Sequence, residues 1–224
     1  MDAVVIMAKE PKVGEVKTRL VPPLTPEEAA RLYHNFLLDK VAQLSLIPDI
    51  QHCLAYYPRT ARDFFQDLVP STFMLIEQVG PDLGERLKNV SSHMLDRNFD
   101  KILMIDSDTP NLPTSYLTDA LSALENNDAV LGPCEDGGYY LIGIKTAVPG
   151  LFRGIPWSTP DVNKVTLQRA EELGISIEKL ATWFDVDTIA ELERLKNEIE
   201  ASRGETTREF FCANTYDFLV EFFK

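Results

Sequence analysis

Residues 101–113 read KILMIDSDTPNLP. The apolar run in this stretch, residues 102–105, predicts a buried strand that leads directly into Asp106, Ser107 and Asp108, and Thr109 with Pro110 then ends it. Carboxylates at the end of a buried strand cost free energy unless a cation pairs with them, and a divalent metal ion is one such cation. The stretch therefore raises the question of which other polar groups meet at that edge.

Similar apolar runs alternate with helical patterns along the whole chain. We expect strands at 4–7, 50–57, 73–76, 101–105, 129–132 and 139–144, and helices at 26–41, 60–68, 82–95, 114–124, 160–173, 188–202 and 207–224. This alternation predicts an α/β fold with a mostly parallel, mixed sheet that helices cover on both faces. In such sheets ligands bind outside the carboxyl ends of the strands, so the polar residues after each strand are the candidate site.

The length of 224 residues fits one domain with a proper core. We expect residues 1–202 to form that domain and residues 203–224 to form a helical tail. The tail is rich in aromatic residues, which need cover from water, so it either packs on the domain or makes a homodimer contact.

The charge and the cysteines exclude several classes of protein. A net charge of −13 argues against broad binding to nucleic acid or to acidic membranes. The apolar runs are too short to span a membrane, and the first residues lack the features of a signal peptide. Three widely spaced cysteines form neither a disulfide framework nor a zinc pattern. We therefore expect a cytoplasmic protein.

The loop after the first strand is the first candidate binding segment. It carries four cations, Lys9, Lys12, Lys17 and Arg19, around the single glycine Gly14. Arg19 and Lys17 could hold a phosphate while Gly14 lets the backbone approach it, although a solvated basic loop explains the same residues equally well. No Gly-x-x-x-x-Gly-Lys or Gly-x-Gly-x-x-Gly pattern occurs in the chain.

The segment Gly80–Arg86 follows the third expected strand and opens a helix. Asp82 and Glu85 have the spacing of a capping box, which explains both acids structurally. In a functional interpretation, Gly84 leaves room for a flat base or a ribose next to Arg86. The structural interpretation is favoured by the residues alone.

Two Asp-x-Asp pairs follow expected strands, Asp106 with Asp108 and Asp185 with Asp187. A single aspartate at such a junction usually caps a turn or a helix. Two pairs at two junctions could instead bring carboxylates together around one Mg²⁺ or Mn²⁺ ion. Both interpretations stay open.

The segment 135–140 joins two expected strands through Glu135, Asp136, Gly137 and Gly138. The glycines indicate a tight turn without any function. The two acids beside them could serve as a general base or bind sugar hydroxyls.

Two further residues could contact an acceptor. Trp157 could stack on it or fill core, and Thr159 is the expected N-cap of the helix at 160–173.

Taken in order, these segments resemble a bacterial group of glycosyltransferase A-fold proteins, the nucleotide-diphospho-sugar transferase-like family. The resemblance covers roughly residues 1–195 and rests on six segments, at 8–20, 80–86, 108–113, 132–141, 157–159 and 185–188. It implies that Arg19 and Lys17 hold the phosphates of a nucleotide and that Gly80–Arg86 lies near the base. It also implies that Asp108 and Asp187 bind the metal ion and that Asp136 faces the sugar or the acceptor. At Asp106 the chain departs from the family, which commonly has glycine there.

The resemblance implies a metal-dependent transferase that acts on a nucleotide-diphospho-sugar donor and a small-molecule acceptor, with Mg²⁺ or Mn²⁺ as cofactor. The same fold also hosts nucleotidyltransferases, which release pyrophosphate and usually carry a glycine-rich first loop with a following Pro-Lys. Here that loop has one glycine, and Pro22-Pro23-Leu24 offers no lysine, which favours glycosyl transfer. A non-catalytic nucleotide-binding protein is the other alternative.

Overall fold

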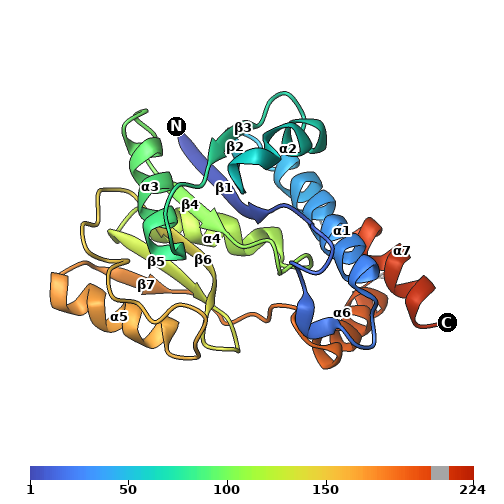
Figure 1. Ribbon diagram of the computed structural model, residues 1–224. Coiled ribbons are helices and arrows are strands. Elements are labelled where there is room, and N and C mark those ends of the chain that lie inside the picture. The colour runs from blue at the N-terminus through green and yellow to red at the C-terminus, as the bar shows by residue number, and fades with distance from the viewer. Residues whose placement is uncertain (203–211) are drawn as a thin grey trace.

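The computed structural model describes residues 1–202 and 212–224, and it has the predicted α/β architecture (Figure 1). The strands are β1 (Asp2–Lys9), β2 (Ile50–Tyr57), β3 (Met74–Glu77), β4 (Ile102–Ile105), β5 (Ala129–Pro133), β6 (Tyr139–Ile144) and β7 (Ile177–Lys179). The helices are α1 (Pro26–Ser45), α2 (Arg62–Leu68), α3 (Leu83–Leu95), α4 (Thr114–Ala123), α5 (Val162–Leu173), α6 (Ile189–Ser202) and α7 (Ala213–Phe222). Short 3-10 helices at Thr18–Leu20 and Arg59–Ala61 complete the elements.

All strands join one sheet in the order β3-β2-β1-β4-β6-β5-β7. Every neighbouring pair is parallel except the two pairs that β6 makes, with β4 and with β5. The mostly parallel, mixed sheet that the sequence predicts is therefore confirmed. From β1 the chain adds β2 and β3 on one side of the sheet and then crosses to add β4 on the other side of β1. Such a change in the direction of strand order is a topological switch point, where α/β sheets bind ligands.

Helices cover both faces of the sheet, which explains why its central strands are apolar throughout. Alternate residues of β1 point to opposite faces: Val4 and Ile6 join one buried cluster, whereas Ala3 and Val5 join the other. Residues of α1, α2, α4, α6 and α7 share the first cluster, and residues of α3 and α5 share the second. Figure 1 shows α3 and α5 on one side of the sheet and α1, α6 and α7 on the other.

A complete capping box forms at the start of α1, whereas the one that the sequence predicts at Asp82 and Glu85 does not form. At α1, Thr25 accepts from the backbone N–H of Glu28 at 3.1 Å and the Glu28 carboxylate accepts from Thr25 N–H at 2.7 Å, so this capping box is complete. At α3, Asp82 accepts from Glu85 N–H at 2.9 Å, but the Glu85 side chain contacts Lys88 instead. Asp82 is therefore a simple N-cap.

The structure differs from the sequence prediction in two elements. Strand β7 is not among the predicted strands, because it has three residues, of which Glu178 and Lys179 are exposed at the sheet edge. Helix α5 starts at Val162 and not at residue 160, so the expected N-cap role of Thr159 is wrong. The Thr159 hydroxyl instead donates to the carbonyl of Pro156 at 2.7 Å and accepts from Asp161 N–H at 3.3 Å, which forms a local turn.

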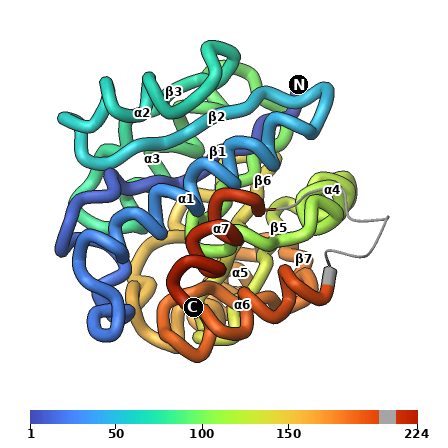
Figure 2. The backbone as a smooth tube through the Cα atoms, turned by 90° about the vertical axis from the view of Figure 1, so that its right-hand side faces the viewer, coloured from blue at the N-terminus to red at the C-terminus, as the bar shows by residue number. Residues whose placement is uncertain are grey.

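Helix α7 lies against α1 in Figure 2, and its Phe218 and Leu219 are buried in the same core cluster as residues of α1. The buried carboxylate of Asp39 on α1 accepts from the backbone N–H groups of Asn214 and Thr215 and so caps α7 from outside. The part of the expected tail helix at 207–211 lies outside the described residues. No helix within residues 1–202 and 212–224 is long and apolar enough to cross a membrane.

Candidate functional site

Four segments meet at the carboxyl edge of β1 and β4. The basic loop follows β1, and Asp106–Asp108 follows β4. Because β6 is antiparallel and pairs Leu141 with Ile105, the turn that precedes β6 returns to the same edge. The segment before α6 reaches it too, since Cys134 forms a bridge with Trp183 and Val186 N–H donates to the carbonyl of Asp108 at 3.1 Å. The sheet order thus brings both Asp-x-Asp pairs together.

An open cavity of about 520 Å³ lies at this edge, a size within the usual range of small-molecule sites. It is lined by these predicted site residues: Arg19, Asp108, Asp136, Gly138, Trp157, Thr159 and Asp187. A smaller, mostly apolar cavity of about 170 Å³ shares Asp108 and Tyr139 with it and also reaches Asp106. Predicted residues of the first loop, of both Asp-x-Asp segments, of the turn before β6 and of residues 157–159 therefore border the larger cavity, whereas Gly80, Gly84 and Arg86 do not line it.

The Lys17 ammonium lies between the two predicted metal ligands. Its Nζ is 2.5 Å from Asp108 Oδ1 and 2.9 Å from Asp187 Oδ1, and it donates to the carbonyl of Val186 at 2.8 Å. The side chain is 3% exposed. Although burial alone lowers the pKa of Lys17, the carboxylates of Asp108 and Asp187 raise it above its usual value, so the amine stays charged.

Asp187 is held as a carboxylate by two cations. Burial works to raise its pKa, but Lys17 and then Arg19 outweigh burial and lower it. Arg19 Nη1 is 3.2 Å from Asp187 Oδ2, and 66% of the Arg19 side chain is exposed. Arg19 is therefore the cation of this loop that lines the cavity, where an incoming anion would meet it.

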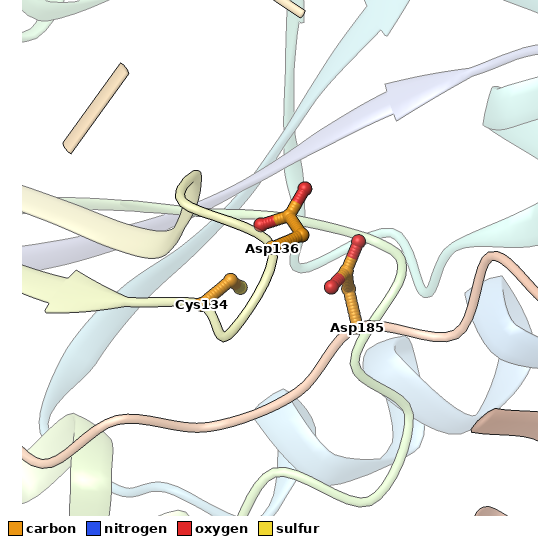
Figure 3. Close-up of side chains that lie close together, drawn as sticks. All are labelled: Cys134, Asp136 and Asp185. Atoms are coloured by element: carbon orange, nitrogen blue, oxygen red, sulfur yellow. The ribbon is translucent and has the colours of Figure 1, made fainter. Parts of the chain in front are cut away.

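A second group of acids lies beside the first. Side-chain atoms of Cys134, Asp136 and Asp185 lie within 4.8 Å of one another, and Figure 3 shows Cys134 and Asp136 on one turn with Asp185 on the segment that faces it. Burial, then Asp136 and Asp187, raise the pKa of Asp185 to about 7. Burial also raises the pKa of the Cys134 thiol, so at neutral pH the sulfur is protonated and a poor metal ligand.

Asp106 is half-buried and borders the smaller, mostly apolar cavity. Burial raises its pKa to about 7, against the opposing effect of Lys40, and Thr109 Oγ1 donates to its carboxylate at 2.5 Å. Lys40 on α1 is fully buried, and its Nζ has no hydrogen-bond partner within the described residues. Burial lowers the pKa of Lys40. This pair supports the floor of the site.

The turn that carries Asp136 has a fixed shape. Gly137 has φ +95°, and a Cβ there would lie 2.0 Å from the carbonyl oxygen of Pro160. Gly138 N–H donates to Asp136 Oδ1 at 2.8 Å, and Asn163 N–H donates to the carbonyl of Gly137 at 2.8 Å. Only glycine fits position 137, and the turn aims Asp136 at the cavity.

The predicted base-binding segment is tied to its own surroundings. The space next to Gly84 is filled, since a Cβ there would lie 2.8 Å from Trp157 Nε1. Arg86 donates to the carbonyl of Gly80 at 3.0 Å and stacks over Tyr57 at 3.8 Å. Its contact with a base stays a prediction.

Three other predicted residues lie at the margin of the site. Lys9 donates to the carbonyl of Glu15 at 3.0 Å within its own loop. Gly14 has φ +76°, and a Cβ at this position would meet no described atom within 4 Å, so the glycine serves the turn of the loop. Glu135 pairs with Arg194 of α6 at 2.8 Å.

Sequence reasoning missed two residues that shape the site, Lys40 and Tyr139, and it gave Asp185 no role of its own beside Asp187. Lys40 could have been found, because it lies four residues after Phe36 and four before Leu44 on the apolar face of its helix. Tyr139 lines both cavities, and its hydroxyl is buried with no hydrogen-bond partner among the described residues. No sequence signal distinguishes it from its neighbour Tyr140.

The oxygen atoms at this site are of the chemical type that a hard divalent cation prefers as ligands. Asp108, Asp187 and the Val186 carbonyl already surround one cation with oxygen atoms, and Asp136 and Asp185 add carboxylates nearby. Oxygen ligands of this type are those that Mg²⁺ and Mn²⁺ prefer.

Comparison with known proteins places the chain in a family. A crystal structure from Desulfovibrio desulfuricans G20, described as a "putative nucleotide-diphospho-sugar transferase", is 30% identical, with a TM-score of 0.84 over 99% of this chain and 95% of that one. More distant structures show the same fold. A 4-diphosphocytidyl-2C-methyl-D-erythritol synthase from Anaerococcus prevotii DSM 20548 is 11% identical, with a TM-score of 0.60 over 89% of this chain and 96% of that one. A CMP:2-keto-3-deoxy-manno-octonic acid synthetase complexed with CTP is 13% identical, with a TM-score of 0.59 over 90% of this chain and 100% of that one.

No curated protein matches the chain. A family model does match it over residues 38–159, and that family is described as "Uncharacterized protein conserved in bacteria (DUF2064)". This chain belongs to the DUF2064 family, and it has the nucleotide-diphospho-sugar transferase fold.

Proposed function

We propose that this protein is a metal-dependent transferase that uses a nucleotide-diphospho-sugar donor. The observation that carries the proposal is the cavity of about 520 Å³ bordered by an exposed arginine, three aspartates and a tryptophan at the switch point of the sheet. The 30% identical protein described as a "putative nucleotide-diphospho-sugar transferase" supports the same class of substrate.

Each part of the cavity suits one part of such a donor. Arg19 is exposed and can form charge-assisted hydrogen bonds to a diphosphate. Trp157 offers an apolar ring to a sugar face, and Asp136 can accept hydrogen bonds from sugar or acceptor hydroxyls. Asp136 is also the carboxylate placed to take the proton of an attacking hydroxyl.

Asp108 and Asp187 would hold Mg²⁺ or Mn²⁺, with Asp136 and Asp185 as neighbouring carboxylates. Bound there, the ion would neutralise the charge of the departing diphosphate. We also place the protein in the cytoplasm, a proposal that its three buried, free cysteines support.

The test is product analysis on a panel of nucleotide sugars and nucleoside triphosphates with Mn²⁺. We expect release of a nucleoside diphosphate from one nucleotide sugar. Asp136→Asn should lower kcat by about 10²-fold or more, because it removes the proton acceptor, whereas the exposed Asp161→Asn should stay close to wild type.

Release of pyrophosphate from a triphosphate would replace the proposal with nucleotidyl transfer. Tight nucleotide binding without any turnover would indicate a binding protein instead.

A further inference from the structure

Lys17 has no hydrogen-bonding capacity left for a ligand. An ammonium group has three N–H donors, and the Lys17 Nζ has three acceptors: Asp108 Oδ1 at 2.5 Å, Asp187 Oδ1 at 2.9 Å and the carbonyl of Val186 at 2.8 Å. A phosphate oxygen could therefore bind Lys17 only after the lysine has released these oxygens. The same three oxygens are the ones that a metal ion at this position would need.

The ammonium and a metal ion therefore compete for one position. Both cannot lie between Asp108 and Asp187, because the amine is already within 3 Å of both carboxylates. The exchange would require rotation of the Lys17 side chain alone, because a lysine carries its amine on a flexible four-carbon stem, whereas the backbone here lies between buried Val16 and buried Leu20. Its backbone has φ 48° and ψ 37°, which directs the start of the 3-10 helix at Thr18–Leu20.

We propose that Lys17 is a built-in counter-ion that is exchanged for the divalent metal, so that the site binds metal and diphosphate together as one chelate. This inference rests on the proposed function and names the form in which its donor binds. The metal ion takes over the carboxylates of Asp108 and Asp187, and the freed ammonium pairs with oxygens of the diphosphate.

Charge balance explains why the two ligands need each other. A metal ion that arrives alone leaves the Lys17 ammonium without a partner in a place where the side chain is only 3% exposed, which is costly. A diphosphate that arrives alone finds Arg19 exposed but Lys17 engaged and the carboxylates close by. When both arrive, every charge has a partner. Metal and diphosphate should therefore bind with positive coupling, and the coupling must be reciprocal.

The experiment measures binding rather than turnover. Isothermal titration calorimetry gives the Mn²⁺ affinity of the ligand-free wild-type protein and of Lys17→Met, which removes the charge and keeps an unbranched side chain. Lys17→Met should bind Mn²⁺ at least about 5-fold more tightly than wild type, the lower end of typical coupling factors. Arg19→Met is the matched control: it removes the other cation on Asp187, which does not lie between the carboxylates, and should change Mn²⁺ affinity by less than about 2-fold.

The second half of the experiment tests the coupling. The probe is the nucleoside diphosphate that most raises the melting temperature, or inorganic pyrophosphate if none does, titrated with EDTA and with saturating Mn²⁺. Mn²⁺ should tighten binding to wild type by about 5-fold to 150-fold, and Lys17→Met should show a much smaller factor. Lys17→Gln, which keeps hydrogen-bond donors without the charge, replaces Lys17→Met if that variant does not fold.

Equal Mn²⁺ affinity in wild type and Lys17→Met would overturn the exchange. A diphosphate affinity that is the same with and without Mn²⁺ in both proteins would overturn it as well. Lys17 would then be a permanent substitute for the metal. These results differ from failure of the proposed function, in which coupled binding is found but no nucleotide sugar is turned over.

Discussion

The pKa of Asp185 gives a prediction that needs neither substrate nor metal. Burial and two neighbouring acids raise this pKa to about 7 in the folded chain, whereas an aspartate in an unfolded chain titrates near 3.9. Between these two values the folded protein holds a proton that the unfolded chain has lost. The contribution of Asp185 to the free energy of unfolding therefore falls as the pH rises from about 4 to about 7, and it stays low above that range.

The substitution Asp185→Asn removes this titration and nearly preserves the shape of the side chain. From pH 5 to pH 8 the linkage amounts to about 2.7 kcal/mol at 1.36 kcal/mol per pKa unit, and partial exposure of the side chain reduces it to about 1–1.5 kcal/mol. Relative to wild type, the variant should therefore gain about 1–1.5 kcal/mol of stability between pH 5 and pH 8. Other groups that titrate there, such as Asp106, are present in both proteins and cancel to first order.

The assay is urea unfolding at pH 5, 6, 7 and 8 in EDTA, followed by circular dichroism. The exposed Asp67→Asn is the control and should run parallel to wild type at every pH. Parallel curves for wild type and Asp185→Asn would refute the reasoning, because they would mean that Asp185 is ionised in the folded protein throughout this range.

Two further substitutions test the frame of the site. Asp39→Ala should lower the free energy of unfolding in urea denaturation by about 2–3 kcal/mol, because the carboxylate accepts hydrogen bonds from two backbone N–H groups of α7 and from the Asn214 side chain. The control, Asp67→Ala, should lower it by less than about 0.5 kcal/mol. Gly137→Ala should destabilise by about 2 kcal/mol or more and reduce activity, because its Cβ would lie 2.0 Å from the Pro160 carbonyl. Gly174→Ala, also at positive φ but in open space, should cost about 1 kcal/mol and leave activity unchanged.

The sheet and the meeting of the two Asp-x-Asp pairs could be predicted because they depend on local signals. Apolar runs bounded by proline and acids mark β1 and β4, and parallel strands bring their carboxyl ends to one edge. Strand β7 and the start of α5 could not be predicted, since each depends on neighbours: β7 is polar and gains its hydrogen bonds from β5, and α5 begins only after the local turn at Thr159.

The pairing inside the site could not be predicted for a different reason. Lys17 and Asp187 are 170 residues apart, and no local pattern shows which of the four cations in the first loop is buried. Because Lys17 and Arg19 lie two residues apart in a loop where a phosphate site is expected, the sequence favours the interpretation that both contact the phosphate. The structure separates them: Arg19 is exposed, whereas Lys17 is 3% exposed and bound to acids.

The edge has to remain folded when no ligand is bound, although five aspartates gather there in a protein with a net charge of −13. Four of these acids are stabilised by a neighbouring cation or by a proton. Lys17 neutralises Asp108 and Asp187, a proton neutralises Asp185 below about pH 7, and Asp106 has Lys40 and the Thr109 hydroxyl. An anion that arrives without a cation would add negative charge to this edge and would meet Arg19 as the one cation among the described residues that line the cavity. We therefore propose that the arrangement selects ligands that bring their own positive charge, a requirement that a diphosphate bound to a divalent metal ion would meet.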